Sequence, residues 1–144
     1  MTAQQIYVLA IGNLSLTENE SDTDIEAVSV GALNQLLDES LRIENSIRKR
    51  RKYDWERAGK PVITPAEELL MEELKEAPLI SSLNDDIPYA NTLCVNALVQ
   101  GLTSFLWTDD ENNYNAVDWR GRYVAALNGA EQFVPEYVQN IYSI

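Results

Sequence analysis

The stretch from Leu79 to Leu127 constrains the fold more than any other part of the chain. It contains two apolar segments of helical length, Pro88–Trp107 and one from Thr108 to about Asn128, which meet at a short acidic turn. Two helices joined so closely must lie antiparallel. Neither apolar face carries a polar residue suited to catalysis. The sequence therefore predicts a helical hairpin that packs against the rest of the chain and presents a surface.

Two helices are predicted ahead of this hairpin. The first covers Gln4–Ile11, an apolar segment closed by Gly12-Asn13. The second begins at a capping box formed by Thr23 and Glu26 and runs over Asp24–Arg50, because cations suit the C-terminal end of a helix.

The region from residue 51 to residue 87 is predicted to be a long variable loop. Within it, Thr64 is followed by Pro65 and Glu67, which is typical of a helix start, and this acidic surface helix should end near Glu76. The predicted fold class is all-α, a small helical bundle with this loop and an apolar C-terminal arm. The expected core residues are Leu33, Leu36, Leu37, Leu98, Leu102, Phe105, Leu106 and Val124.

Two residues of the 88–107 segment indicate close packing. Gly101 costs a helix about 1 kcal/mol relative to Ala, which favours a neighbouring helix that approaches closely at this point. Cys94 shares a helical face with Leu98 and Leu102. We therefore expect Cys94 to be a small buried apolar side chain rather than a reactive thiol.

Few residues could carry chemistry. The chain has one cysteine and no histidine, which excludes an intrachain disulfide, His-based or Cys-rich zinc sites, and Ser–His or Cys–His catalysis. The carboxylate groups Asp85-Asp86, Glu67-Glu68 and Asp109-Asp110-Glu111 are explained by helix capping. The acidic run Glu18–Glu26 lacks the central Gly of a calcium loop. We therefore expect no enzymatic activity, no cofactor and no metal.

The net charge of −12 is unevenly distributed, because seven of the eleven cations lie between Arg48 and Lys60. This basic run is either solvated, pairs with an acidic face of an adjacent subunit, or touches DNA phosphates. An acidic remainder repels DNA and favours subunit pairing. The candidate subunit-interface residues are Arg48, Lys49, Arg50, Arg51, Tyr53 and Trp55.

The segment 130–144 is apolar and aromatic, whereas a disordered tail would be polar. Its apolar residues suit a short amphipathic helix that starts near Pro135. The segment either packs back on its own bundle or docks into a partner. We divide the chain into a helical domain, 1–129, and a docking arm, 130–144. The candidate docking residues are Phe133, Val134, Tyr137, Val138, Ile141 and Tyr142.

These features also carry a family resemblance. The run SLNDDIPY, an apolar helix centred on Gly101, an acidic turn and an aromatic helix ending in RYVAAL resemble the second half of the head–tail adaptor (connector) proteins of tailed bacteriophages. The short first helix and the long helix with a basic end are similar to the first half of these proteins. The segment Tyr53–Pro78 fits the pattern least well.

The resemblance implies a structural virion protein without catalytic activity. Copies of the chain, most simply twelve, would form a ring that joins the portal protein to a downstream neck or tail protein. DNA would pass through the channel without specific binding, and the C-terminal segment would grip the portal. The chain would lie at the head–tail junction of the virion, and in the host cytoplasm during assembly.

The membrane is not among the expected partners. No apolar run approaches the ~20 residues that span a bilayer, and the N-terminus lacks the pattern of a signal peptide. The alternative function is a small acidic helical binding module, such as a DNA mimic or an inhibitor of a basic host protein. A mimic would bind a basic protein without any portal present, whereas an adaptor would assemble on a portal.

Overall fold

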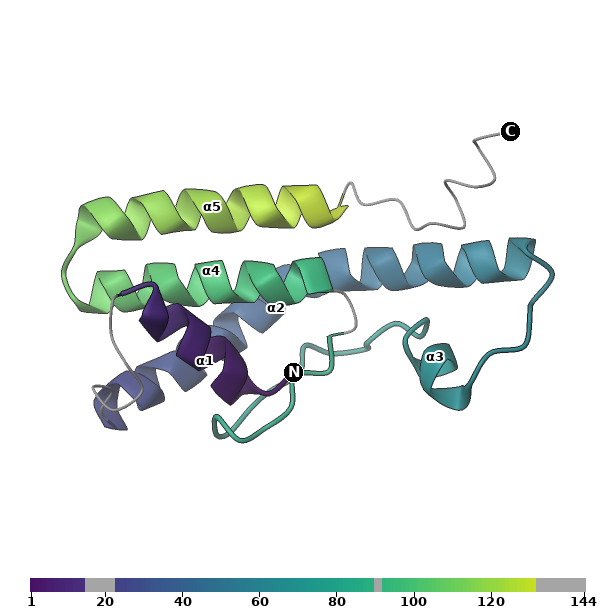
Figure 1. Cartoon of the computed structure of the whole chain (residues 1–144), viewed down its shortest axis with the longest axis horizontal. Coiled ribbons are helices and arrows are strands. Elements are labelled where there is room, and N and C mark those ends of the chain that lie inside the picture. Colours follow the sequence, from purple (N-terminus) through teal and green to yellow (C-terminus); the bar gives the residue numbers. More distant parts are fainter. Residues whose placement is uncertain (15–22, 90–91, 132–144) are drawn as a thin grey trace.

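The computed structural model (Figure 1) describes residues 1–14, 23–89 and 92–131. These residues form five helices and no strand, which confirms the predicted all-α bundle; the nearest approach to a sheet is a single bridge between Thr2 and Asp86. The helices are α1 (Ala3–Gly12), α2 (Thr23–Arg57), α3 (Pro65–Leu69), α4 (Thr92–Asp109) and α5 (Asn113–Glu131).

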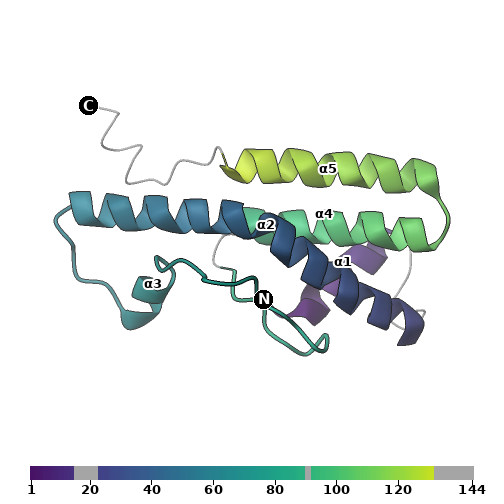
Figure 2. The ribbon, with the colours of Figure 1, turned by 180° about the vertical axis from the view of Figure 1, so that it is seen from behind.

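Helix α4 is the centre of the bundle, because α1, α2 and α5 each contact it more extensively than they contact one another. The α4 and α5 helices lie antiparallel along most of their length, as the hairpin prediction required (Figure 1). The long α2 helix crosses this hairpin, changes direction near its middle and continues beyond the start of α4 (Figures 1 and 2). The molecule is therefore elongated, with the α4–α5 turn near one end and the C-terminal end of α2 at the other.

Helix α1 is held at its N-terminus by its own cap and by the loop before α4. Thr2 forms a capping box with Gln5. The N–H groups of Ala3 and Gln4 donate to the carbonyls of Asp85 and Leu83 over 2.9 and 2.7 Å. First-turn N–H groups have no partner inside their own helix, so these bonds attach the loop to α1. The apolar face of α1 then packs into the core, where Ile6, Tyr7 and Ile11 are buried.

Helix α2 continues two turns beyond the predicted end at Arg50. Its termination signal is the turn after Arg57, where Gly59 and Lys60 have φ angles of 89° and 53°. The N–H of Lys60 donates to the carbonyl of Trp55 over 3.0 Å, which is a Schellman-type helix end. The cations at 48–52 therefore lie within the helix, and the predicted loop starts at residue 58 instead of residue 51.

Helix α3 starts where predicted but ends much earlier, at Leu69 instead of Glu76. Thr64 caps it by accepting from the N–H of Glu67 over 3.2 Å. Beyond Leu69 the chain is bound to α2 instead of continuing as a helix. The Arg48 guanidinium donates to the carbonyls of Leu69 and Glu72 over 3.3 and 2.8 Å.

The turn between α4 and α5 also differs from the prediction. Helix α4 continues to Asp109, and Glu111 adopts a left-handed conformation with φ of 59°. The cap of α5 is Asn112, whose side chain accepts from the N–H of Asn115 over 3.1 Å. Thr108, the predicted cap, instead donates to the carbonyl of Ser104 in the preceding turn.

Most of the predicted core is buried. Leu33, Leu36, Leu37, Leu98, Leu102 and Leu106 are buried as expected, and so is Cys94. Phe105 is partly buried. The prediction that Val124 lies in the core was wrong, since the residue is 44% exposed. It lies on a face of α5 that α4 does not cover.

Gly101 allows α4 to approach both of its neighbours, as predicted. A Cβ at this position would lie 2.6 Å from Leu36 Cδ2 on α2 and 3.0 Å from Tyr123 Cδ1 on α5. The first distance is shorter than real Cβ contacts, and the second is tighter than most of them. The missing side chain therefore sets the separation of three helices.

Candidate assembly surfaces

A basic and aromatic stripe runs along the last turns of α2. Its residues recur at three- and four-residue intervals, so they share one helix face. We call them the α2 stripe: Lys49, Lys52, Tyr53, Glu56 and Arg57, all exposed. The Tyr53 side chain is 57% exposed, and the Arg57 guanidinium lies 5.5 Å from the centre of its ring. Exposed Tyr and Arg side chains of this kind are enriched at protein interfaces.

Arg48 does not belong to this surface, which corrects the prediction for that residue. Its guanidinium is buried and pairs with the buried carboxylate of Glu44 at 3.3 Å. The remaining donors reach three loop carbonyls, including that of Pro88 at 2.6 Å. A buried cation persists only when its charge and donors are matched in this way. Arg48 therefore attaches the 58–89 loop to α2.

The other predicted interface residues are distributed over several environments. Lys49 is exposed and pairs with Glu73 at 3.4 Å. Arg50 and Arg51 are half-buried. Trp55 is also half-buried, and its indole N–H donates to the carbonyl of Pro61 over 2.8 Å. Tyr53 and Lys49 are thus the members of the predicted set that face outward most fully.

Two asparagines on α2 bind the same loop through paired hydrogen bonds. The Asn34 side chain donates to the carbonyl of Ile80 and accepts from its N–H, over 3.0 and 2.8 Å. The Asn45 side chain forms the same pair with Leu74, over 2.9 and 2.8 Å. The two asparagines lie about three helical turns apart, on one face of α2. Neither contact could be predicted from the sequence, since an Asn within a helix does not indicate a hydrogen-bond partner far along the chain.

A buried polar cluster joins this loop to the core. The Tyr89 hydroxyl donates to the carbonyl of Leu37 over 2.6 Å and lies 2.9 Å from the hydroxyl of Ser40. Burial is the main cause that raises the pKa of the Tyr89 hydroxyl. Burial, and then the nearby Glu44 carboxylate, raises the pKa of the Cys94 thiol to about 12. Cys94 is therefore a protonated, enclosed thiol at neutral pH, unlike the exposed thiolates that react.

Of the three carboxylate groups noted in the sequence, those at 85–86 and 67–68 have local structural roles. Asp85 accepts from the N–H groups of Ser81 and Ser82 over 2.7 and 3.2 Å, and these bonds lower its pKa. Glu67 and Glu68 lie in the first turn of α3. The run 109–111 was predicted to cap a helix start but forms the turn at the end of α4. Its three side chains are exposed and form no ion pair with any described residue.

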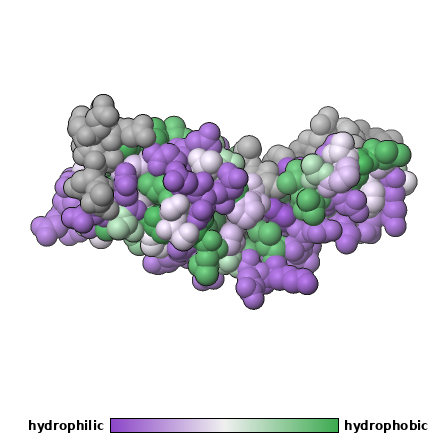
Figure 3. All heavy atoms as spheres, turned by 90° about the horizontal axis from the view of Figure 1, so that it is seen from below, coloured by the Kyte–Doolittle hydropathy of each residue, from purple (hydrophilic) through white to green (hydrophobic). Residues whose placement is uncertain are grey.

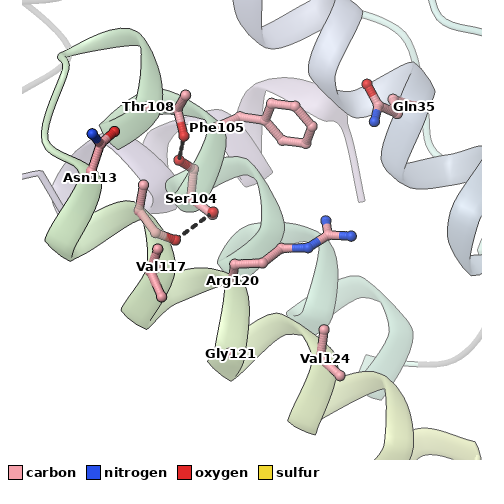
Figure 4. Close-up of a pocket in the computed structure, with 10 residues that line it drawn as sticks. Gln35, Ser104, Phe105, Thr108, Asn113, Val117, Arg120, Gly121 and Val124 are labelled. Atoms are coloured by element: carbon pink, nitrogen blue, oxygen red, sulfur yellow. Dashed lines mark hydrogen bonds between the residues drawn. The ribbon is translucent and has the colours of Figure 1, made fainter.

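An apolar groove lies beside this acidic turn, between α2, α4 and α5. It has a volume of about 740 Å³. Thr108 and Asn113, which flank the turn, line one end of it, and Phe105 and Arg120 extend across it toward Gln35 on α2 (Figure 4). Val117, Gly121 and Val124 form the α5 side. We call this feature the α5 groove.

The groove exists because α5 has two apolar faces. One face packs on α4 through Ala116, Tyr123 and Ala130, which are buried. The other leaves Val117 73% exposed and Val124 44% exposed. Of the apolar residues of α5, the sequence analysis assigned only Val124 to the core, and Val124 lies on the exposed face. The signal that separates the two faces is their angular offset around the helix, which a count of apolar residues ignores.

Polar contacts between α2 and α5 lie beside the groove. The Glu39 carboxylate accepts from Arg120 and from the Tyr123 hydroxyl, both over 3.2 Å. The Arg120 guanidinium also lies 4.8 Å from the centre of the Tyr123 ring. Burial, and then Glu39, raises the pKa of the Tyr123 hydroxyl. These contacts fix the cation at the inner edge of the groove and leave its apolar wall uncovered.

Other exposed apolar residues are scattered. Val62, Leu69 and Leu79 are exposed in the 58–89 loop. On the face seen from below, apolar areas are separated by hydrophilic ones, including at the end that carries α3 (Figure 3). Single exposed apolar residues are normal on a protein surface. The α5 groove differs from them because its apolar residues are contiguous.

The predicted docking residues Phe133, Val134, Tyr137, Val138, Ile141 and Tyr142 lie outside the described residues. The domain boundary at 129 shifts, since α5 continues through Glu131. Ala130 is buried, and Glu131 pairs with Arg42 at 2.7 Å. The first two residues of the predicted arm thus belong to the helical domain.

Comparison of the chain with protein-family models, curated proteins and solved structures gives no match. Within the described residues, no His, Cys, Asp or Glu side chains gather in a group that could bind a metal. None of the described helices combines the length and the apolar character needed to cross a bilayer.

Proposed function

We propose that this protein is a structural head–tail connector (adaptor) of a tailed bacteriophage. The observation that carries the proposal is the elongated architecture, in which two uncovered contact surfaces lie toward opposite ends. The α2 stripe lies at one end, and the α5 groove lies beside the acidic turn at the other (Figure 1). A chain that must contact copies of itself on two sides needs two such surfaces.

The assembled form in this proposal is a ring, most simply of twelve copies, with no catalytic activity. The ring contacts the portal on one side and a neck or tail protein on the other, at the head–tail junction of the virion. Its net charge of −12 per chain favours an acidic channel wall. Such a wall repels phosphates and lets the duplex slide without sticking.

The segment 132–144 is the portal contact in this proposal. Its apolar and aromatic residues would fill pockets on the portal, because aromatic anchors supply much of the free energy of protein binding. The proposal limits this contact to the residues after Glu131, since Ala130 and Glu131 serve the bundle itself.

The test compares the full chain with a chain that ends at Glu131, each mixed with portal rings encoded in the same genome and sedimented. The full chain should co-sediment with the portal, whereas the shorter chain should stay in the supernatant. Circular dichroism should show that the shorter chain keeps the helices of the bundle. Equal co-sedimentation would place the portal contact elsewhere, and unfolding of the shorter chain would make the segment part of the core.

A failure of both chains to co-sediment would contradict the adaptor function itself. Binding of the full chain to a basic protein in the absence of portal would favour the acidic binding module instead. That module draws its support from the net charge alone, whereas the adaptor also explains why a basic stripe and an apolar groove are left exposed.

A further inference from the structure

We propose that the α5 groove of one copy receives the α2 stripe of the next copy, so that the chains join end to end. This inference deepens the proposed function, since it identifies the two surfaces through which the copies of a ring would contact each other. It commits to a second copy of this chain as the occupant of the groove.

Shape is the first reason for this pairing. The stripe is a helix face that projects beyond the bundle, with the exposed Tyr53 ring as its apolar centre. The groove is an open trough with an apolar wall formed by Val117 and Val124 and with Phe105 beside it. A helix that lays an aromatic anchor into an apolar trough is a recurrent mode of recognition between proteins.

Charge is the second reason. The cations Lys52 and Arg57 flank the Tyr53 ring on the stripe. The acidic turn 109–111 connects Thr108 and Asn113, which line the groove. Its Asp109 and Asp110 side chains line a separate pocket with Leu14 and Ile25, and the turn forms no ion pair with any described residue. The stripe therefore carries three cations and one acid, Glu56, whereas the turn carries three acids, and the Arg120 cation in the groove is paired with Glu39. Such complementarity selects the partner and orients the contact.

The chain's own C-terminal segment is the competing occupant, and its charge is unsuitable. Residues 132–144 contain one acid, Glu136, and no Lys or Arg. Their one acid and the acidic turn carry charge of the same sign. The cations of the α2 stripe are better matched to this end of the molecule.

Geometry sets the form of the assembly. The stripe and the groove lie toward opposite ends of the long axis (Figure 1), so a contact between them is heterologous. Repeated heterologous contacts give a closed ring when the rotation between copies closes, and a filament when it does not. The inference thus accounts for a ring without any two-fold contact.

The test uses charge reversal in two separate variants of the full chain, without portal. The stripe variant is Lys52→Glu with Arg57→Glu, and the turn variant is Asp109→Lys with Asp110→Lys. Sedimentation velocity at low ionic strength should show that each variant alone self-associates at least about tenfold more weakly than the wild type. An equimolar mixture should regain association, because each reversed surface then meets its complement on the other variant.

The matched controls reverse exposed charges that belong to neither surface. Glu68→Lys with Glu76→Lys matches the turn variant, and Lys75→Glu matches the sign of the stripe variant; both should associate like the wild type. Circular dichroism verifies that every variant is folded.

Cross-linking is a second test of the same contact. The single native cysteine, Cys94, is buried, so Lys52→Cys and Val117→Cys chains can be mixed and joined with a bifunctional maleimide. The expected product is a covalent dimer of one Lys52→Cys chain and one Val117→Cys chain.

Several results would overturn the inference. They are a wild type that stays monomeric at millimolar concentration, variants that associate normally, and a mixture of folded variants that fails to regain association. Loss of association in a chain ending at Glu131, with both charge variants unaffected, would make the C-terminal segment the occupant. All of these readouts are independent of portal binding, so they separate a failure of this contact from a failure of the adaptor function.

Discussion

At the residue scale, Gly101 is the glycine of the described chain at which an added Cβ would meet neighbouring atoms. Gly101→Ala would place a methyl group 2.6 Å from Leu36 Cδ2. Overpacking of a core costs about 1–3 kcal/mol, which should outweigh the gain of about 1 kcal/mol in helix propensity. Gly31→Ala is the control, because nothing lies within 4 Å of a Cβ there. Urea unfolding should show opposite signs for the two variants. Equal stabilisation by both would contradict the close approach at Gly101.

Cys94 gives the residue scale a pH-dependent prediction. Its pKa is raised from 9.0 to about 12 in the folded chain. Above pH 9 the unfolded chain therefore releases the thiol proton while the folded chain keeps it. The free energy of unfolding should fall as pH rises, by up to about 1.4 kcal/mol per pH unit for this proton. Cys94→Ala should flatten that fall and leave the slope at neutral pH unchanged. An identical alkaline slope in both chains would show that the thiol is accessible when folded.

Residue-level expectations succeeded where burial follows from local periodicity. Cys94, Leu98 and Gly101 were placed correctly because each shares a face with other apolar residues three or four positions away. Arg48 was misplaced because its partners are carbonyls of a loop that comes 21 to 40 residues later. Nothing in a run of cations distinguishes the one that turns inward.

At the element scale, helix existence was predictable and helix length was less so. The start of α3 and the existence of α1, α2, α4 and α5 follow from caps and periodicity. The end of α2 is formed by the local turn at Gly59 and Lys60, whereas beyond the end of α3 the Arg48 and Asn45 side chains bind backbone groups of the loop. Val124 was assigned to the core because periodicity within α5 does not tell its two apolar faces apart. Which apolar face stays exposed depends on where α2 crosses the hairpin.

The asparagine pairs predict how the 58–89 loop is attached. Asn45→Ala would leave the N–H and carbonyl of Leu74 without their partner, which costs about 1–3 kcal/mol for groups of this kind. Hydrogen exchange should accelerate at the Leu74 amide, whereas the amides of α4 should keep their protection. Asn96→Ala, at an exposed position of α4, is the control. Unchanged exchange at Leu74 would mean that the loop is held by other contacts.

At the scale of the whole molecule, exposed charge should control association. Contacts between exposed charges are screened by salt, since the Debye length falls from about 10 Å at 0.1 M to about 3 Å at 1 M. Self-association through the α2 stripe and the acidic turn should therefore weaken as salt rises over this range. Sedimentation velocity measures the change. Association that strengthens with salt would indicate an interface dominated by apolar contact instead.

The central proposal, that this chain is a portal adaptor, is tested most directly by imaging. Portal rings from the same genome are mixed with the full chain and viewed by negative-stain electron microscopy. Class averages should show an additional coaxial ring on one face of the portal, with the same rotational symmetry in end views. Portal rings that look identical with and without the protein, at concentrations where the chain is folded and in excess, would contradict the adaptor function.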